Sequence, residues 1–234
     1  MGSTRLPGKS MLPLAGKPLI FRVLQRITRI TSLDEVILAT SNLNADDVLV
    51  DVARSLGIPT VRGSEQNVAE RFEKAIKQFD LDVVLRIPAD NYLTEVWAVN
   101  QLIETHFENR GGFTTNIMEI SNSGFPDGVG GEAFEASDFL TRHSRLCPAD
   151  TDEHVHKHFY TYSKDDVHLV TSGAVRTCSC PSEYSYPSLR FDINTEEEYV
   201  KAKEIYDELC DSECSFGLKD VIDWMTMKSL PPFC

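Results

Sequence analysis

The sequence lacks an excess of positive charge. Its 234 residues include 23 Lys and Arg against 36 Asp and Glu, which leaves a formal net charge of −13 and a pI of about 4.9. Proteins that bind nucleic acid need a basic surface to neutralise the phosphate backbone. The composition therefore argues against nucleic acid as a partner.

Long apolar runs are also missing. No uninterrupted run approaches the ~18 residues that would cross a bilayer, and the N-terminus has no basic stretch followed by the apolar core of a signal peptide. The hydrophobic fraction of 41% and the charged fraction of 25% are ordinary for a soluble globular protein. We expect no membrane contact and a cytoplasmic location.

Cysteine is absent from the first half of the chain, and its spacing in the second half lacks the paired C-x-x-C pattern of a structural zinc site. Disulfide frameworks belong mostly to short secreted chains, which this chain does not resemble. We therefore expect free thiols at all six positions. They are Cys147, Cys178, Cys180, Cys210, Cys214 and Cys234.

Apolar strands and amphipathic helices alternate along the first part of the chain. Helices are expected over 19–30, 45–56, 68–79 and 196–209, and short strands over 36–39, 59–61 and 83–87. The strands are continuously apolar, which is typical of a parallel sheet that is covered on both faces. The sequence therefore predicts an α/β fold, a three-layer, mostly parallel, doubly wound sheet, in a single domain spanning 1–234.

The opening loop combines small residues with two cations immediately before a helix. Gly2 and Ser3 would let backbone N–H groups approach an anion, Arg5 and Lys9 add positive charge, and the N-terminus of the helix adds to it. The pattern predicts a cradle for nucleotide phosphates. The alternative is a solvated turn, since the string matches neither a Walker loop nor G-x-G-x-x-G.

Two aspartates follow apolar segments at positions suited to a metal. Asp90 comes just after the strand that ends at Ile87, and in open α/β sheets ligands gather at the carboxyl ends of strands. Asp192 follows Leu189 to Phe191. Because Mg²⁺ usually takes one or two carboxylates plus phosphate oxygens and water, this pair would suffice. The alternative for Asp90 is a helix N-cap.

Three alternating histidines, His154, His156 and His158, suggest a zinc site, because imidazole is a common zinc ligand. They would share one side of the chain only on a strand, whereas Thr151 to Glu153 have the character of a helix start. A metal site is therefore not the favoured interpretation.

Seven segments, in this order, resemble successive blocks of the cytidylyltransferase family. That family includes the spore coat polysaccharide biosynthesis protein F type and, more distantly, the enzymes that make CMP-Kdo and CMP-sialic acid. The resemblance spans nearly the whole chain, and the opening segment is the most specific. The segments are MGSTRLPGKSMLPLAGKPLIFRVLQRI, EVILATS, GIPTVRGSEQNVAERF, VVLRIPADN, FPDGVGGEAFE, DEHVHKHFY and LRFDINTEEEYVKAKEIY.

The resemblance implies transfer of CMP from CTP to an acidic or amino sugar with release of pyrophosphate, Mg²⁺ as cofactor and a homodimer. It also implies roles for individual residues. Arg5, Lys9 and Lys17 would contact the nucleotide phosphates or the sugar acid, and Arg62, Ser64 and Arg71 would lie near the nucleotide or sugar. Asp90 would bind Mg²⁺, Asp127 and Glu132 would face the sugar pocket, and His154 would begin an element near the sugar site and the dimer contact.

The chain departs from the family pattern at two positions. Where relatives often have Asp-Thr-Pro-Glu-Asp, the corresponding segment of this chain starts with Asn194. The aspartate that is frequently the second metal ligand is therefore an amide here, and Asp192 could serve as the ligand instead. Asn67 stands at a usually acidic position. Two alternatives stay open, a guanylyl- or other nucleotidyltransferase of the same fold and a non-catalytic homologue that binds a sugar or nucleotide. A nucleotide panel would separate them.

Relatives carry an apolar strand directly before the segment that opens this chain, so we expect codons upstream of Met1 to encode such a strand. Without it, two neighbouring strand edges would be unpaired and the protein should be poorly soluble or loosely folded. Thermal unfolding and CTP binding should therefore improve in the extended chain. Equal cooperativity and equal CTP affinity in the two versions would show that the strand is not needed.

Overall fold

The structure, a computed structural model, describes residues 5–108, 112–117, 123–145, 155–162, 167–169 and 175–228. No helix in these ranges is both long and apolar enough to cross a membrane. The α-helices are α1 (Leu19–Ile27), α2 (Asp47–Ser55), α3 (Val68–Phe79), α4 (Val96–Glu108), α6 (Ala136–His143), α7 (Glu196–Leu209) and α8 (Leu218–Met227). The 3₁₀ turns are η1 (Lys9–Met11), η2 (Asn44–Asp46), η4 (Val155–His158) and η5 (Ser182–Tyr184).

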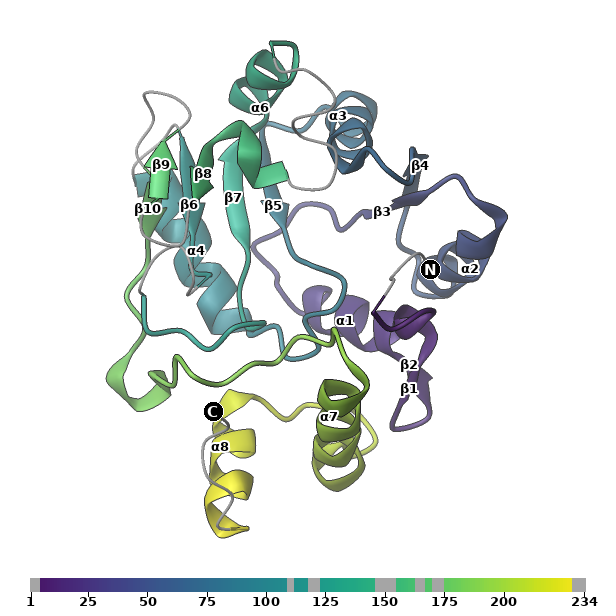
Figure 1. Ribbon diagram of the computed structural model, residues 1–234, viewed down its shortest axis with the longest axis vertical. Coiled ribbons are helices and arrows are strands. Elements are labelled where there is room, and N and C mark those ends of the chain that lie inside the picture. Colours follow the sequence, from purple (N-terminus) through teal and green to yellow (C-terminus); the bar gives the residue numbers. More distant parts are fainter. Residues whose placement is uncertain are drawn as a thin grey trace.

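The strands form one mixed sheet and three pairs. The four-stranded sheet has the order β10 (Val175–Thr177), β6 (Phe113–Thr115), β7 (Glu132–Glu135), β5 (Val83–Arg86) and stands to the left in Figure 1. The pairs are the parallel β3 (Leu38–Ser41) and β4 (Thr60–Gly63), and the antiparallel β1 (Pro13–Leu14) with β2 (Lys17–Pro18) and β8 (Tyr160–Tyr162) with β9 (Val167–Leu169).

Both faces of the four-stranded sheet are covered, because adjacent residues of one strand enter different cores. On β5, Val84 joins the core beneath α3 and α6, whereas Leu85 packs against the larger core that holds α1, α4, α7 and α8. On β7, Phe134 and Ala133 divide in the same way. Successive side chains of a strand point to opposite faces. This arrangement gives the three layers of the expected α/β fold.

The direction of β7 is a detail that the sequence pattern does not reveal. This strand runs antiparallel to both β6 and β5, while β10 runs parallel to β6. An apolar strand has the same composition in either direction, so only the chain path decides its orientation. Among the described strands, no hydrogen-bonded pairing joins β3 to β5, and the upstream strand stays a prediction.

The helix predictions are confirmed with small shifts. Helix α3 has the expected bounds, ended by Asp80 in the left-handed region, and α7 begins at Glu196 behind a capping box formed by Thr195 and Glu198. Pro18 precedes α1 as its N-cap instead of entering its first turn. A 3₁₀ turn, η2, replaces the expected start of α2.

The prediction of free thiols is wrong for one pair. Cys210 and Cys214 form a disulfide, because the chain turns back after α7 and brings their Cα atoms to 4.3 Å. Cys214 adopts a positive φ of 51° in that turn. Cys178 and Cys180 are free, and Cys147 and Cys234 lie outside the described residues.

Arg26 of α1 and Arg29, just after that helix, hold the C-terminal part of the chain. Arg26 is buried and donates from Nη2 to the Phe216 carbonyl at 2.9 Å and from Nε to the Tyr206 hydroxyl at 3.3 Å. Tyr206 in turn donates to the carbonyl of Tyr92 at 2.8 Å. Arg29 donates to the carbonyls of Glu213 and Cys214. Buried backbone carbonyls therefore receive the hydrogen bonds that they need.

We expect Tyr206→Phe to lower the free energy of unfolding by about 1–2 kcal/mol, because the Tyr92 carbonyl loses a donor and Arg26 loses an acceptor while the ring still packs. Urea denaturation measures the change. Tyr199→Phe is the matched control, since its hydroxyl also donates from α7 to a carbonyl, that of Pro13, but at an exposed position. A control loss as large as that of Tyr206→Phe would contradict this account.

Candidate functional site

Three distant segments meet in an extended strip at the carboxyl end of β5. The Ile193 N–H donates to the carbonyl of Asp90, and the Tyr92 N–H donates to that of Phe191. On the other side, Asp127 exchanges backbone hydrogen bonds with Leu189 and Phe191. This strip sets the side chains of residues 90, 127 and 190–194 beside one another.

Alternation along residues 189–194 decides which side chains enter the site. Leu189, Phe191 and Ile193 are almost fully buried in the large core. Arg190, Asp192 and Asn194 occupy the intervening positions, so they project from the opposite side of the extended chain. A period of two thus builds a polar row over an apolar one.

Lys9 lies at the centre of the site. Its ammonium donates to Asp90 Oδ2 at 2.6 Å, to the Ile193 carbonyl at 2.6 Å and to Asn194 Oδ1 at 3.2 Å. Its side chain is only 15% exposed. Gly8, with a φ of 72°, makes the turn that begins η1 and directs Lys9 inward.

Asn194 links the opening loop to Asp192. Its Oδ1 accepts from Arg5 Nη2 at 2.9 Å as well as from Lys9, and its Nδ2 donates to Asp192 Oδ2. A carboxylate at this position could accept from both cations but could not donate to Asp192. The amide therefore joins two cations to an anion.

Arg190 joins the two remaining carboxylates. It donates from Nε and Nη2 to the two oxygens of Asp192, at 3.1 and 3.0 Å, and its Nη2 lies 2.9 Å from Asp127 Oδ2. Gly128 lets the Asp127 segment approach this closely, because a Cβ there would meet the Phe191 carbonyl carbon at 2.5 Å and its φ is 85°. Three cations, Arg5, Lys9 and Arg190, thus face three aspartates.

The other predicted site residues lie in different surroundings. Glu132 lies in β7, is 1% exposed and pairs with Arg86 at 2.6 Å. Ser64 accepts from the Asn67 N–H at the start of α3. Lys17 is exposed, with its ammonium over the ring of Phe21. Gly2, Ser3 and His154 lie outside the described residues.

The two remaining arginines are held by the protein itself. Burial lowers the pKa of Arg71, whose Nη2 donates to the Glu65 carbonyl and whose Nε is buried without a hydrogen-bond partner in the described structure. Arg62 donates to the carbonyls of Ser41 and Leu43 and to Asp47, so it fixes the loop after β3.

The oxygen atoms of the site suit a hard divalent cation if the substrate supplies further oxygen ligands. Within the described ranges, no group of three or more His, Cys, Asp or Glu side chains is arranged to hold a metal. The oxygens around Lys9 come from one carboxylate, one amide and one backbone carbonyl. Oxygen ligands of this kind suit Mg²⁺, whose remaining positions are usually filled by phosphate oxygens and water.

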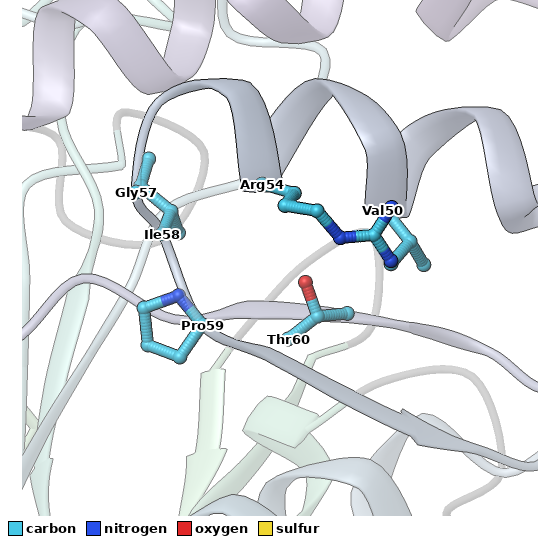
Figure 2. Close-up of a pocket in the computed structure, with 6 residues that line it drawn as sticks. All are labelled: Val50, Arg54, Gly57, Ile58, Pro59 and Thr60. Carbon is cyan, nitrogen blue, oxygen red and sulfur yellow. The ribbon is translucent and has the colours of Figure 1, made fainter.

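One hollow in the described structure, about 430 Å³ in volume, lies elsewhere. Figure 2 shows it between the end of α2 and the start of β4, with Arg54 and Val50 on one side and Gly57, Ile58, Pro59 and Thr60 around the rest. It sits at the amino end of β4. The site residues gather at the carboxyl end of β5, where α/β folds bind ligands.

Of the predicted histidine triplet, His158 pairs with His143 of α6, and both rings pack against Phe139. His158, on η4, has Nδ1 2.9 Å from the Val155 carbonyl, so that nitrogen carries the proton. Its Nε2 therefore accepts from His143 Nδ1 at 3.0 Å. Burial lowers the pKa of His158 to about 4, although the Val155 hydrogen bond opposes the shift.

Sequence reasoning missed Arg190 and the Ile193 carbonyl. The alternation of apolar and polar residues over 189–194 is a strand-like signal that would have placed Arg190 beside Asp192. No sequence signal identifies the Ile193 carbonyl, because every residue carries one. The alternative of Asp90 as a helix cap does not hold, since α4 begins only at Val96.

Comparisons with known proteins agree on a family. A family model described as Cytidylyltransferase matches residues 1–177. Spore coat polysaccharide biosynthesis protein SpsF of Bacillus subtilis is 29% identical over 210 residues, which are 88% of this chain and 82% of that protein. The 3-deoxy-manno-octulosonate cytidylyltransferase of Trichlorobacter lovleyi is 30% identical, but over only 47% of this chain and 43% of the enzyme.

Solved structures agree on the fold. A cytidylyltransferase from Leptospira borgpetersenii superposes with a TM-score of 0.82 at 24% identity, covering 98% of this chain and 91% of that one. A CMP:2-keto-3-deoxy-manno-octonic acid synthetase solved with CTP gives a TM-score of 0.63 at 16% identity, over 88% and 95% of the two chains. The expected nucleotidyltransferase fold is thereby confirmed.

Protonation of His158 should weaken the fold in mild acid. Its pKa is about 4 in the native state against about 6.5 unfolded, so the stability is fully present above pH 6.5 and is lost as pH falls toward 4. Between pH 7 and 5 the free energy of unfolding should fall by about 2 kcal/mol for this group. Urea titrations of His158→Gln should show a flatter pH dependence, and parallel curves would refute the assignment.

Proposed function

Because the chain belongs to the cytidylyltransferase family, we propose that it transfers CMP from CTP to a sugar and releases pyrophosphate. The observation that carries this proposal is the meeting of Arg5, Lys9, Asp90 and Asn194 at the carboxyl end of β5. Two cations and an oxygen-rich cluster there suit a nucleotide triphosphate and its counter-ion.

In the proposed reaction, a hydroxyl of the sugar attacks the α-phosphorus of CTP. The bond from that phosphorus to the bridging oxygen breaks as the new P–O bond forms, and pyrophosphate leaves with the electron pair. Such phosphoryl chemistry depends on positioning and on charge neutralisation. Arg5 and Lys9 would bind the phosphates, and no covalent intermediate is needed.

Asp127 is the better candidate to accept the proton of the sugar hydroxyl. Its carboxylate is 20% exposed and held by Arg190, whereas Glu132 is 1% exposed and paired with Arg86. A general base must reach the proton that it abstracts. Asp127 therefore combines a fixed position with access from outside.

Asp90, the Ile193 carbonyl and the oxygen of Asn194 would hold Mg²⁺, and Asp192, whose oxygens accept from Arg190 and from the Asn194 amide, would position Asn194. Bound there, Mg²⁺ would neutralise charge on the triphosphate and stabilise the transition state. The chain's contribution is to hold these oxygens in place, because Asn194 precedes the capped N-terminus of α7 and Asp192 is fixed by Arg190.

The family also supports a finer proposal on the substrate. The relative SpsF is named for spore coat polysaccharide biosynthesis, and other relatives are 3-deoxy-manno-octulosonate cytidylyltransferases. We propose that the substrate is an acidic or amino sugar destined for a surface polysaccharide or other glycan. We also propose that the enzyme acts as a cytoplasmic homodimer. The alternative of another nucleotide stays open because a phosphate cradle of backbone and charge indicates little about the base, and the alternative of a non-catalytic role rests on Asn194 and Asn67.

We expect pyrophosphate release from CTP only with Mg²⁺ and an acidic or amino sugar. Asp90→Asn should lower turnover more than tenfold, since a catalytic metal supplies several kcal/mol to the transition state. Its melting temperature should hardly change, because the amide oxygen introduced there can still accept from Lys9, which also keeps its bonds to the Ile193 carbonyl and Asn194. Coupled pyrophosphate detection and thermal unfolding measure the two effects.

Asp51→Asn is the matched control, because it removes one exposed aspartate that pairs with Arg54 on the same helix, α2. Its turnover should equal that of the wild type. A nucleotide panel decides the base, and turnover with GTP in place of CTP would correct the proposal. If the protein shows no turnover and no nucleotide binding across a broad panel of sugars, it is a non-catalytic homologue.

A further inference from the structure

We propose that Lys9 occupies the cation position of the site until nucleotide arrives, so that the free protein excludes the divalent metal. The inference rests on the proposed function, since it concerns the order in which nucleotide and metal enter the same site. It starts from the hydrogen bonds of a single ammonium group.

The donors of Lys9 are fully used. An ammonium group has three N–H donors and no acceptor. Here three oxygens surround Nζ at 2.6, 2.6 and 3.2 Å, from Asp90, the Ile193 carbonyl and Asn194. Lys9 therefore has no donor left for a phosphate while it stays among these oxygens.

Binding to a phosphate and binding to the three oxygens are consequently alternatives for Lys9. If Lys9 turns to the triphosphate, it leaves one carboxylate and two neutral oxygens directed at one point. A carboxylate that is only 25% exposed is destabilised when it loses its cation. The three oxygens then form a site that requires a new cation.

The charges around the strip are paired while Lys9 stays among the three oxygens. With Lys9 in place, Arg5, Lys9 and Arg190 balance Asp90, Asp127 and Asp192. A divalent ion could reach the three oxygens only by displacing the Lys9 ammonium that already binds them. An incoming triphosphate supplies the negative charge that admits the ion and draws Lys9 away.

Mn²⁺ binding to nucleotide-free protein, measured by electron paramagnetic resonance, tests the exchange. Wild type should bind Mn²⁺ weakly. Lys9→Met should bind it at least tenfold more tightly, because the oxygens are vacated, and Lys9→Gln should also gain affinity. Adding Asp90→Asn to Lys9→Met should abolish the gain.

Arg5→Met is the matched control. It removes the same charge from the same neighbourhood, but of the three residues whose oxygens surround Lys9, Arg5 contacts only Asn194. Its Mn²⁺ affinity should stay within about threefold of wild type if occupancy, and not general electrostatics, excludes the metal. Thermal unfolding gives a second readout, since Mn²⁺ should raise the melting temperature of Lys9→Met far more than that of wild type.

Three results would overturn the proposal. These are tight Mn²⁺ binding by the free wild type, no gain in folded Lys9→Met and Lys9→Gln, and an equal gain in Arg5→Met. Variants that fold neither with nor without Mn²⁺ would also overturn it, because a metal in the vacated position should replace the lost charge. The test needs no turnover, so a failure of the proposed sugar transfer would be seen separately in the pyrophosphate assay.

Discussion

The extended strip that joins residues 90–92, 127 and 189–193 is the constraint on which the site depends. Its backbone hydrogen bonds unite the segment after β5, the loop before β7 and the segment before α7. Its apolar residues are anchored in the core, so the polar row between them has little freedom. Precise placement of the charged groups thus follows from burial of their neighbours.

The strip also determines how charge is shared. Lys9 and Arg190 enter from opposite ends of the polar row, one from the opening loop and one from the row itself. Asn194 lies between them and is the group that both accepts and donates. An amide suits this intermediate position, since either charged alternative would face a group of its own sign.

Much of this could be predicted from the sequence. The apolar periodicity of residues 68–79 and 196–209 predicted the bounds of α3 and α7, because this signal is local. The contact of Lys9 with Asp90 spans 81 positions, and its contact with the Ile193 carbonyl spans 184. Such distances in sequence carry no local pattern. The disulfide of Cys210 and Cys214 was not predicted for another reason, since spacing alone does not show how the chain turns after a helix.

The arginines of α1 have a consequence for synthesis of the chain. Arg26 finds its partners 180 and 190 residues further on, at Tyr206 and Phe216. A ribosome delivers α1 long before either partner, so the Arg26 guanidinium stays hydrated until α7 and the following loop have emerged. Because domains acquire their stability as units during synthesis, the large core around α1 cannot close early. The apolar face of this amphipathic helix therefore stays without its packing partners until almost all of the sequence has been translated.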